Sequence, residues 1–173
     1  MSLSDIAEGV ATTESQRDRG VAVVDRTDTS LADALAPFAD SLPCEPAAAA
    51  TVLREYADGS SVGDAAVAAG VAPMTASKTL HRLGFEGLSP LSPLEREICR
   101  DWLDAELTRS EARSLIDAGE TGFALGAYIE THEAIPEAVD LVQDALSTDA
   151  DAMVEKRDAL ADTMTASRDL LGG

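Results

Sequence analysis

Apolar residues recur at helical spacing along nearly the whole chain, and the alternation typical of β-strands is almost absent. The only short β-favouring run is VAVVD at residues 21–25, and charged residues flank it on both sides. Elsewhere, prolines, glycines and capping residues divide the chain into helical segments. The pattern predicts an all-α fold, and 173 residues suffice for one domain or for two small helical units.

Changes in composition and the positions of the prolines predict five segments. Residues 1–29 are rich in charge, and we expect them to be loosely ordered. A three-helix unit should span residues 30–86, and the proline-rich GLSPLSP at residues 87–93 should link it to the next unit. Residues 94–147 should form a second small helical bundle, and residues 148–173 a C-terminal helix.

The second bundle is predicted from two clear helix starts. Ser92 can cap a first helix whose inward face would carry Leu94 and Trp102, together with the apolar residues between and after them. Pro136 begins a later helix, and Val142 should face the interior of the same bundle.

The expected C-terminal helix is long, charged and only weakly apolar. Met153, Leu160 and Met164 approximate an apolar seam, but Arg157 and Ser167 interrupt it. We therefore expect a docked or frayed terminal helix rather than a coiled coil.

The chain is strongly acidic, with 32 acids against 13 bases and a net charge of −19. Acids are spread from Asp5 to Asp169, which disfavours an acidic tail. A charged shell that keeps the fold dissolved in concentrated salt is the favoured explanation and indicates a halophilic source. A partner with a basic surface is the competing explanation. High salt would screen charge-driven association.

Cysteine usage and hydropathy indicate a cytoplasmic protein without a membrane partner. Cys44 and Cys99 are too few for a disulfide framework, and we expect both to be buried or half-buried. No apolar run is long enough to span a bilayer, and MSLSDIAEGV at the N-terminus lacks the basic flank and apolar core of a signal peptide.

Residues 61–84, SVGDAAVAAGVAPMTASKTLHRLG, predict two short helices joined by a sharp turn. Ser61 can cap the first helix, VGDAAVAA. Gly70 can adopt the left-handed conformation that turns the chain. Pro73 begins the second helix, PMTASKTLHRL, which Gly84 ends. Alanines on the facing sides of the two helices would allow the helices to approach closely.

This arrangement resembles the helix-turn-helix of DNA-binding proteins, in the three-helix form found in resolvases and sigma-factor regions. Its residues are Ser61, Val62, Ala65, Ala66, Gly70, Val71, Thr75, Lys78 and Leu80. The resemblance includes the preceding helix from Pro46. Ala72 departs from the Ser or Thr common in that family, and Ala76 is smaller than the usual Val or Ile. The whole chain also looks like short proteins of halophilic archaea that share TTESQRDRG and the helix-turn-helix.

The resemblance implies a transcription regulator whose second helix enters the major groove of DNA. Ala76, Leu80 and Leu83 would face the core. The residues expected to face DNA are Pro73, Met74, Thr75, Ser77, Lys78, His81 and Arg82. No acid occurs between Ala65 and Phe85, as expected if that surface meets phosphates.

Other uses of the three-helix unit stay open. Residues 46–88 carry three bases and four acids, so the unit has no broad basic footprint. A buried pair of alanine-rich helices would also avoid acids, because burying an unpaired carboxylate is costly. The alternative is an adaptor that binds a protein through this unit. We also expect a homodimer formed through the second helical unit.

The sequence predicts no enzyme, no cofactor and no metal site. His81 and His132 are the only histidines, and neither has cysteines or carboxylates at metal-ligand spacing. No serine or cysteine has a base suited to nucleophilic catalysis, and no glycine-rich phosphate loop occurs. We expect His132 to lie at a solvated helix end, and Trp102 and Tyr128 to anchor the core of the second unit.

Overall fold

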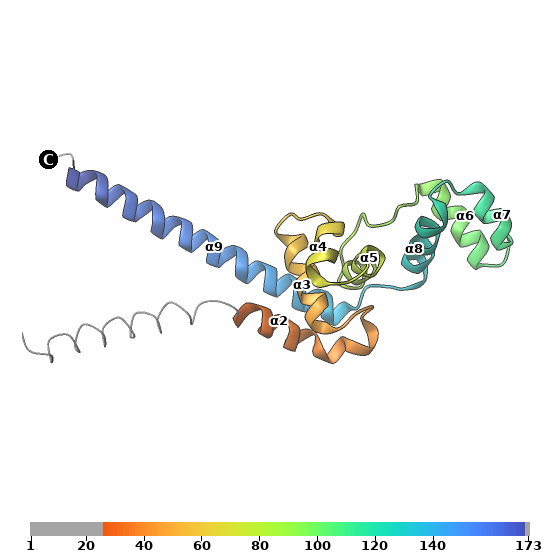
Figure 1. The fold of residues 1–173 in the computed structure, drawn as a ribbon, viewed down its shortest axis with the longest axis horizontal. Helices are drawn as coiled ribbons and strands as arrows, with labels where there is room; N and C mark the ends of the chain where they lie inside the picture. The colour runs from red at the N-terminus through yellow and green to blue at the C-terminus, as the bar shows by residue number, and fades with distance from the viewer. Residues whose placement is uncertain (1–25, 172–173) are drawn as a thin grey trace, which may run out of the picture.

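The structure is a computed structural model that describes residues 26–171. Within that range every regular element is a helix, which confirms the predicted all-α class (Figure 1). The expectations for residues 1–25, including VAVVD, lie outside the described residues. Residues 26–29, the end of the predicted loose segment, belong to the first described helix.

The described helices form two compact groups and one long extension (Figure 1). One group contains α2, η1, α3, α4 and α5, and the other contains α6, α7 and α8. In chain order the elements are α2 (Arg26–Leu35), the 3-10 helix η1 (Ala36–Ser41), α3 (Pro46–Ala57), α4 (Val62–Ala69), α5 (Pro73–Arg82), α6 (Pro93–Leu103), α7 (Arg109–Leu115), α8 (Gly119–Thr131) and α9 (Pro136–Leu171).

The two short helices predicted within residues 61–84 and the turn between them are present as α4 and α5. The Ser61 hydroxyl accepts a hydrogen bond from the backbone N–H of Asp64 at 3.1 Å and so caps α4. Gly70 ends α4 at φ +67°, and Pro73 begins α5. A buried cluster joins α3, α4 and α5 and is built from Val52, Ala65, Ala66, Ala76 and Leu80. Small side chains at this junction let the helices pack closely.

A second buried cluster joins the first group to α9. Its members are Leu35, Leu42, Ala49, Ala50, Leu53, Leu83, Ile135, Ala138 and Val142. The prediction placed Val142 in the second bundle, and this is wrong. The chain returns from α8 to the end of α5, where the Ile135 N–H donates to the Arg82 carbonyl at 2.8 Å. The first turns of α9 therefore complete the first group.

The helix α9 is continuous over Pro136–Leu171, whereas the sequence pattern predicted a boundary at residue 147. No proline or glycine follows Pro136 within it, so nothing in the backbone chemistry interrupts the helix. Figure 1 shows α9 extending away from both groups.

The second group encloses a small core of its own. Leu91, Cys99, Ala112, Ile116 and Phe123 are buried there, with Trp102 packed against Phe123 at 4.9 Å between ring centroids. This confirms the expected role of Trp102. Cys99 is buried and Cys44 half-buried, and both are free thiols, as predicted. Leu94 was expected to face inward, but it is 66% exposed, because Cys99 occupies the centre of the face that α6 buries.

Two capping boxes start the first helices of this group. Ser92 and Glu95 cap α6, and Thr108 and Glu111 cap α7 in the same reciprocal way. Hydrogen bonds from Ser92 lower the pKa of Glu95, and those from Thr108 lower the pKa of Glu111. Both carboxylates are therefore held ionised at the ends of their helices.

Candidate functional site

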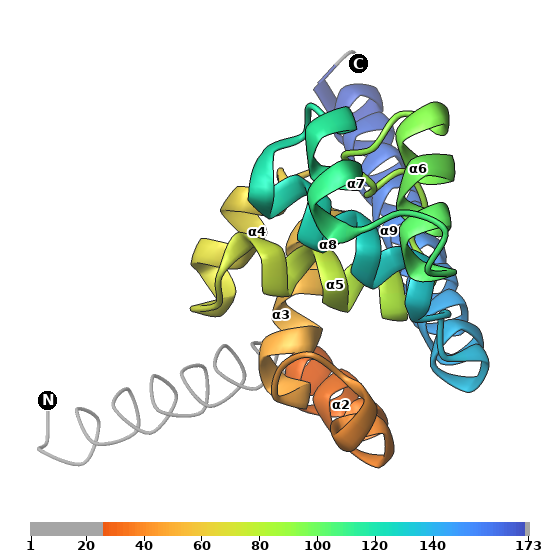
Figure 2. The ribbon, with the colours of Figure 1, turned by 90° about the vertical axis from the view of Figure 1, so that its right-hand side faces the viewer.

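The helix α5, which the sequence predicts to contact DNA, is the helix of the first group that packs against the second group. α8 packs against it, and Figure 2 shows α8 crossing in front of α5. Of the seven residues expected to face DNA, only Pro73 is exposed. The other six are half-buried: Met74, Thr75, Ser77, Lys78, His81 and Arg82.

Lys78 faces the end of α8. Its Nζ lies 4.6 Å from the centroid of the Tyr128 ring, which is a cation–π contact. The Tyr128 ring stacks in turn on His132, with centroids 3.9 Å apart and planes 12° apart. Burial raises the pKa of the Tyr128 hydroxyl, and the nearby charge of Arg82 partly opposes the rise. Tyr128, which α8 carries, therefore connects the second group to α5 of the first group.

Arg82 and His81 hold the loop between α8 and α9. The Arg82 Nε donates to the Ser41 carbonyl at 3.2 Å, and its Nη1 donates to the Glu133 carbonyl. The His81 Nε2 is hydrogen-bonded to the His132 carbonyl. Bonds from a charged donor are about twice as strong as neutral ones, so Arg82 fixes the segments that flank it.

The expectation that Lys78, His81 and Arg82 point outward is therefore wrong. The Tyr128 ring on α8 contacts Lys78, and two backbone carbonyls just after α8 accept hydrogen bonds from His81 and Arg82. Pro73, in the uncharged first turn of α5, is the most exposed of the seven residues, and the charged side chains are only partly exposed. The exposed face of α4 adds an acid there, Asp64, rather than a base.

The remaining polar residues of α5 bond within the helix. The Ser77 hydroxyl donates to the Pro73 carbonyl at 3.1 Å, and the buried Thr79 hydroxyl donates to the Thr75 carbonyl at 2.8 Å. The hydroxyl of Thr79 also lies 3.3 Å from the Cys44 Sγ.

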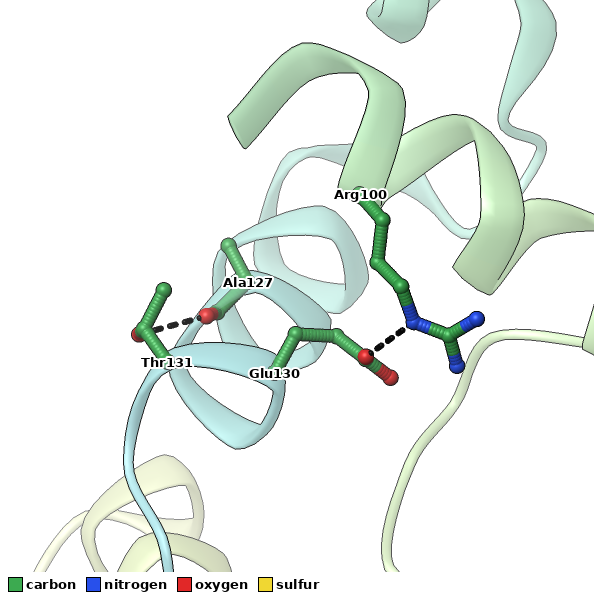
Figure 3. A network of polar contacts seen from close by, with 4 residues as sticks. All are labelled: Arg100, Ala127, Glu130 and Thr131. Carbon is green, nitrogen blue, oxygen red and sulfur yellow. Dashed lines mark hydrogen bonds and ion pairs between the residues drawn. The ribbon is translucent and has the colours of Figure 1, made fainter. Parts of the chain in front are cut away.

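An ion pair fixes the end of α8 from the other side. The Arg100 Nε on α6 lies 2.7 Å from the Glu130 Oε2 on α8, and the Glu130 side chain is only 13% exposed. Figure 3 shows this pair beside the hydrogen bond from the Thr131 hydroxyl to the Ala127 carbonyl, 2.8 Å long. The last turn of α8, which carries Tyr128, is thus held by α6 as well as by α5.

These contacts surround a hollow of about 560 Å³, which we call the cationic hollow. It is lined by Asp40, Ser41, Leu42, Pro43, Thr75, Lys78, Arg82, Tyr128 and His132. Sequence reasoning identified Thr75, Lys78 and Arg82 but missed the aromatic pair. The signal for it was the spacing of Tyr128 and His132, because residues four apart share one face of a helix.

A second surface stands out on α9. Residues 147–160 are all exposed, and they include three large apolar side chains. Met153 is 73% exposed, Leu160 61% and Val154 58%. We call these three residues the α9 apolar strip. Where α9 passes the end of α3, a hollow of about 490 Å³ lies between Met153 and Arg54.

The described residues contain neither a metal-site grouping nor a membrane-spanning helix. In the part of the chain that the structure describes, no three His, Cys, Asp or Glu side chains are grouped as a metal site. No helix in that part combines the length and apolar character that crossing a bilayer requires.

Together, the fold and these surfaces define an all-helical protein of two small helical groups, with a cationic hollow between them and a long exposed helix. The chain belongs to a family of unknown function, DUF7858, whose model matches residues 1–169. No curated protein and no solved structure matches it closely enough to add to that assignment.

Proposed function

We propose that the protein acts by binding a protein partner, as a helical adaptor that presents the α9 apolar strip. The observation that carries this proposal is that every residue of 147–160 is exposed, after Leu146, the last α9 residue packed against the buried cluster. Helices in proteins gain most of their stability from packing against other elements. Exposed apolar side chains clustered on one element are typical of interaction sites.

The charges around the strip indicate the kind of partner. Residues 147–160 carry four acids, Asp149, Asp151, Glu155 and Asp158, and two bases, Lys156 and Arg157. An apolar groove with a basic rim would complement this surface. Such a partner also agrees with the acidity of the whole chain.

Replacing Leu160 with glutamate is expected to weaken partner capture, because it places a charge within the α9 apolar strip. We expect binding to weaken about 10-fold or more, as at a residue that carries much of the binding energy of an interface. The measurement is affinity capture of the tagged full chain from nuclease-treated extract, followed by titration of the recovered protein. Thr148→Glu is the matched control, since it adds the same charge elsewhere on the exposed part of α9 and should keep binding.

Equal capture by Leu160→Glu and wild type would contradict the proposal. A second copy of this chain is one partner that the proposal allows, and the exposed Leu94 offers the second unit a place in a homodimer. Light scattering of the purified protein separates these partners, since a dimeric mass that Leu160→Glu leaves intact points to the second unit.

DNA binding is the second candidate function, and the geometry of the helix-turn-helix favours it. Ser61 caps α4 and Gly70 turns the chain as in a transcription regulator. In this candidate the end of α8 leaves α5, so that Lys78 and Arg82 meet phosphates and base edges. The same capture experiment separates the two functions, because recovery of DNA fragments that nuclease removes favours a regulator.

A further inference from the structure

The two cations in the hollow have no acidic partner. The chain has 32 acids and only 13 bases, so acidic partners are plentiful. Even so, neither Lys78 nor Arg82 forms an ion pair with a carboxylate of the described residues. In the second group, by contrast, Arg100 pairs with Glu130, and Arg109 and Arg113 pair with Glu120. Asp40 is the one acid among the lining residues.

The donors around the hollow suit an anion with several oxygens. Arg82 has five N–H donors, and the Ser41 and Glu133 carbonyls take one from Nε and one from Nη1. The remaining N–H groups, on Nη1 and Nη2, are left to donate to an anion. Together with the three N–H groups of Lys78, they offer donors from two side chains of the hollow, which suits the several oxygens of a phosphate.

The size of the hollow indicates a molecule larger than a bare ion. Its volume of about 560 Å³ falls within the range of small-molecule sites, roughly 300–1,000 Å³. Its walls come from the segment around Pro43 on one side and from Tyr128 and His132 on the other. Hydrogen bonds from Arg82 and His81 hold these walls in place without the ligand.

We propose that the cationic hollow binds a small organic phosphate, with Lys78 and Arg82 as its charged contacts. This phosphate site lies apart from the α9 apolar strip. The proposal therefore does not depend on whether α9 binds a protein. A phosphate of a nucleic-acid backbone shares this chemistry, and a competition titration distinguishes the two sources.

The test is a titration of the full chain with glycerol phosphate and with inorganic phosphate at constant ionic strength. The readout is the ring resonances of the two histidines, since His132 lines the hollow and His81 is bonded to its carbonyl. We expect saturable shifts, with glycerol phosphate binding at least as tightly as inorganic phosphate. Lys78→Met should weaken binding about 10-fold or more, because it removes a charged donor and keeps the packing on Tyr128.

Two further variants serve as a control and as an independent test of the site. Lys156→Met, which removes the only other lysine, from the exposed part of α9, should bind like wild type. Asp40→Asn should bind more tightly, because it removes the lining acid, and this result does not depend on how Lys78→Met folds. Shifts that never saturate, an equal response to added chloride, or unchanged binding by both Lys78→Met and Asp40→Asn would overturn the proposal. Displacement of glycerol phosphate by low concentrations of duplex DNA would overturn the small-molecule source.

Discussion

Gly84→Ala is expected to lower the free energy of unfolding by about 2–5 kcal/mol, the sum of a backbone cost and a packing cost. Gly84 ends the turn after α5 at φ +93°, where an L-residue is strained. A Cβ at this position would lie 2.7 Å from the Val139 Cγ2 on α9. The substitution therefore pushes α9 off the first group. Urea unfolding followed by circular dichroism measures the loss.

Gly59 provides the matched control for this prediction. Its φ is +95°, almost the same as at Gly84, but an added Cβ meets no atom within 4 Å. Gly59→Ala should therefore lose only the backbone cost, about 1–2 kcal/mol. Adding Val139→Ala to Gly84→Ala should recover part of the packing cost. If Gly84→Ala is no less stable than Gly59→Ala, α9 does not pack against Gly84.

Phe123→Ala is expected to destabilise the second group by about 3–5 kcal/mol. Phe123 is 1% exposed and is the largest fully buried side chain of that core. Besides leaving a cavity, the substitution removes the contact with Trp102 and the cation–π contacts of Arg109 and Arg113, each 5.6 Å from the ring centroid. Trp102 is the only tryptophan of the chain, so its fluorescence reports the unfolding of this group directly.

The control for this prediction is Phe123→Leu, which keeps most of the buried volume. It should lose about 1.5 kcal/mol or less, the usual limit for a swap that nearly conserves volume. A Trp102 transition that is equally stable in wild type and Phe123→Ala would show that the ring is not part of a packed core.

The first group could be predicted well because local residues set its helix ends. Pro46 and Pro73 begin helices, Ser61 caps one, and Gly70 turns the chain, and each acts within a few residues of its own position. The continuity of α9 agrees with the sequence, since no proline or glycine lies between Pro136 and Leu171. The predicted boundary at residue 147 is wrong, because no residue there interrupts the helix.

The candidate site was predicted only in part because it depends on contacts between distant residues. Lys78 and Arg82 stand out as bases in an acid-free stretch, and this much is visible in the sequence. The residues that these side chains contact cannot be predicted from the sequence. His81 and His132 are 51 positions apart, and no local pattern specifies that the end of α8 meets α5. The same holds for Leu94, whose exposure depends on how α7 and α8 pack on α6.

Both the cationic hollow and the covering of α5 depend on the contact between Lys78 on α5 and Tyr128 at the end of α8. Selective labelling of the two lysines makes this testable by NMR, because Lys156 on the exposed part of α9 serves as the reference within the same sample. We expect nuclear Overhauser effects between the Lys78 side-chain methylenes and the Tyr128 ring, and an upfield ring-current shift for those methylenes alone. Lys78 resonances that match those of Lys156, with no transfer to an aromatic ring, would contradict this arrangement and leave α5 open to DNA.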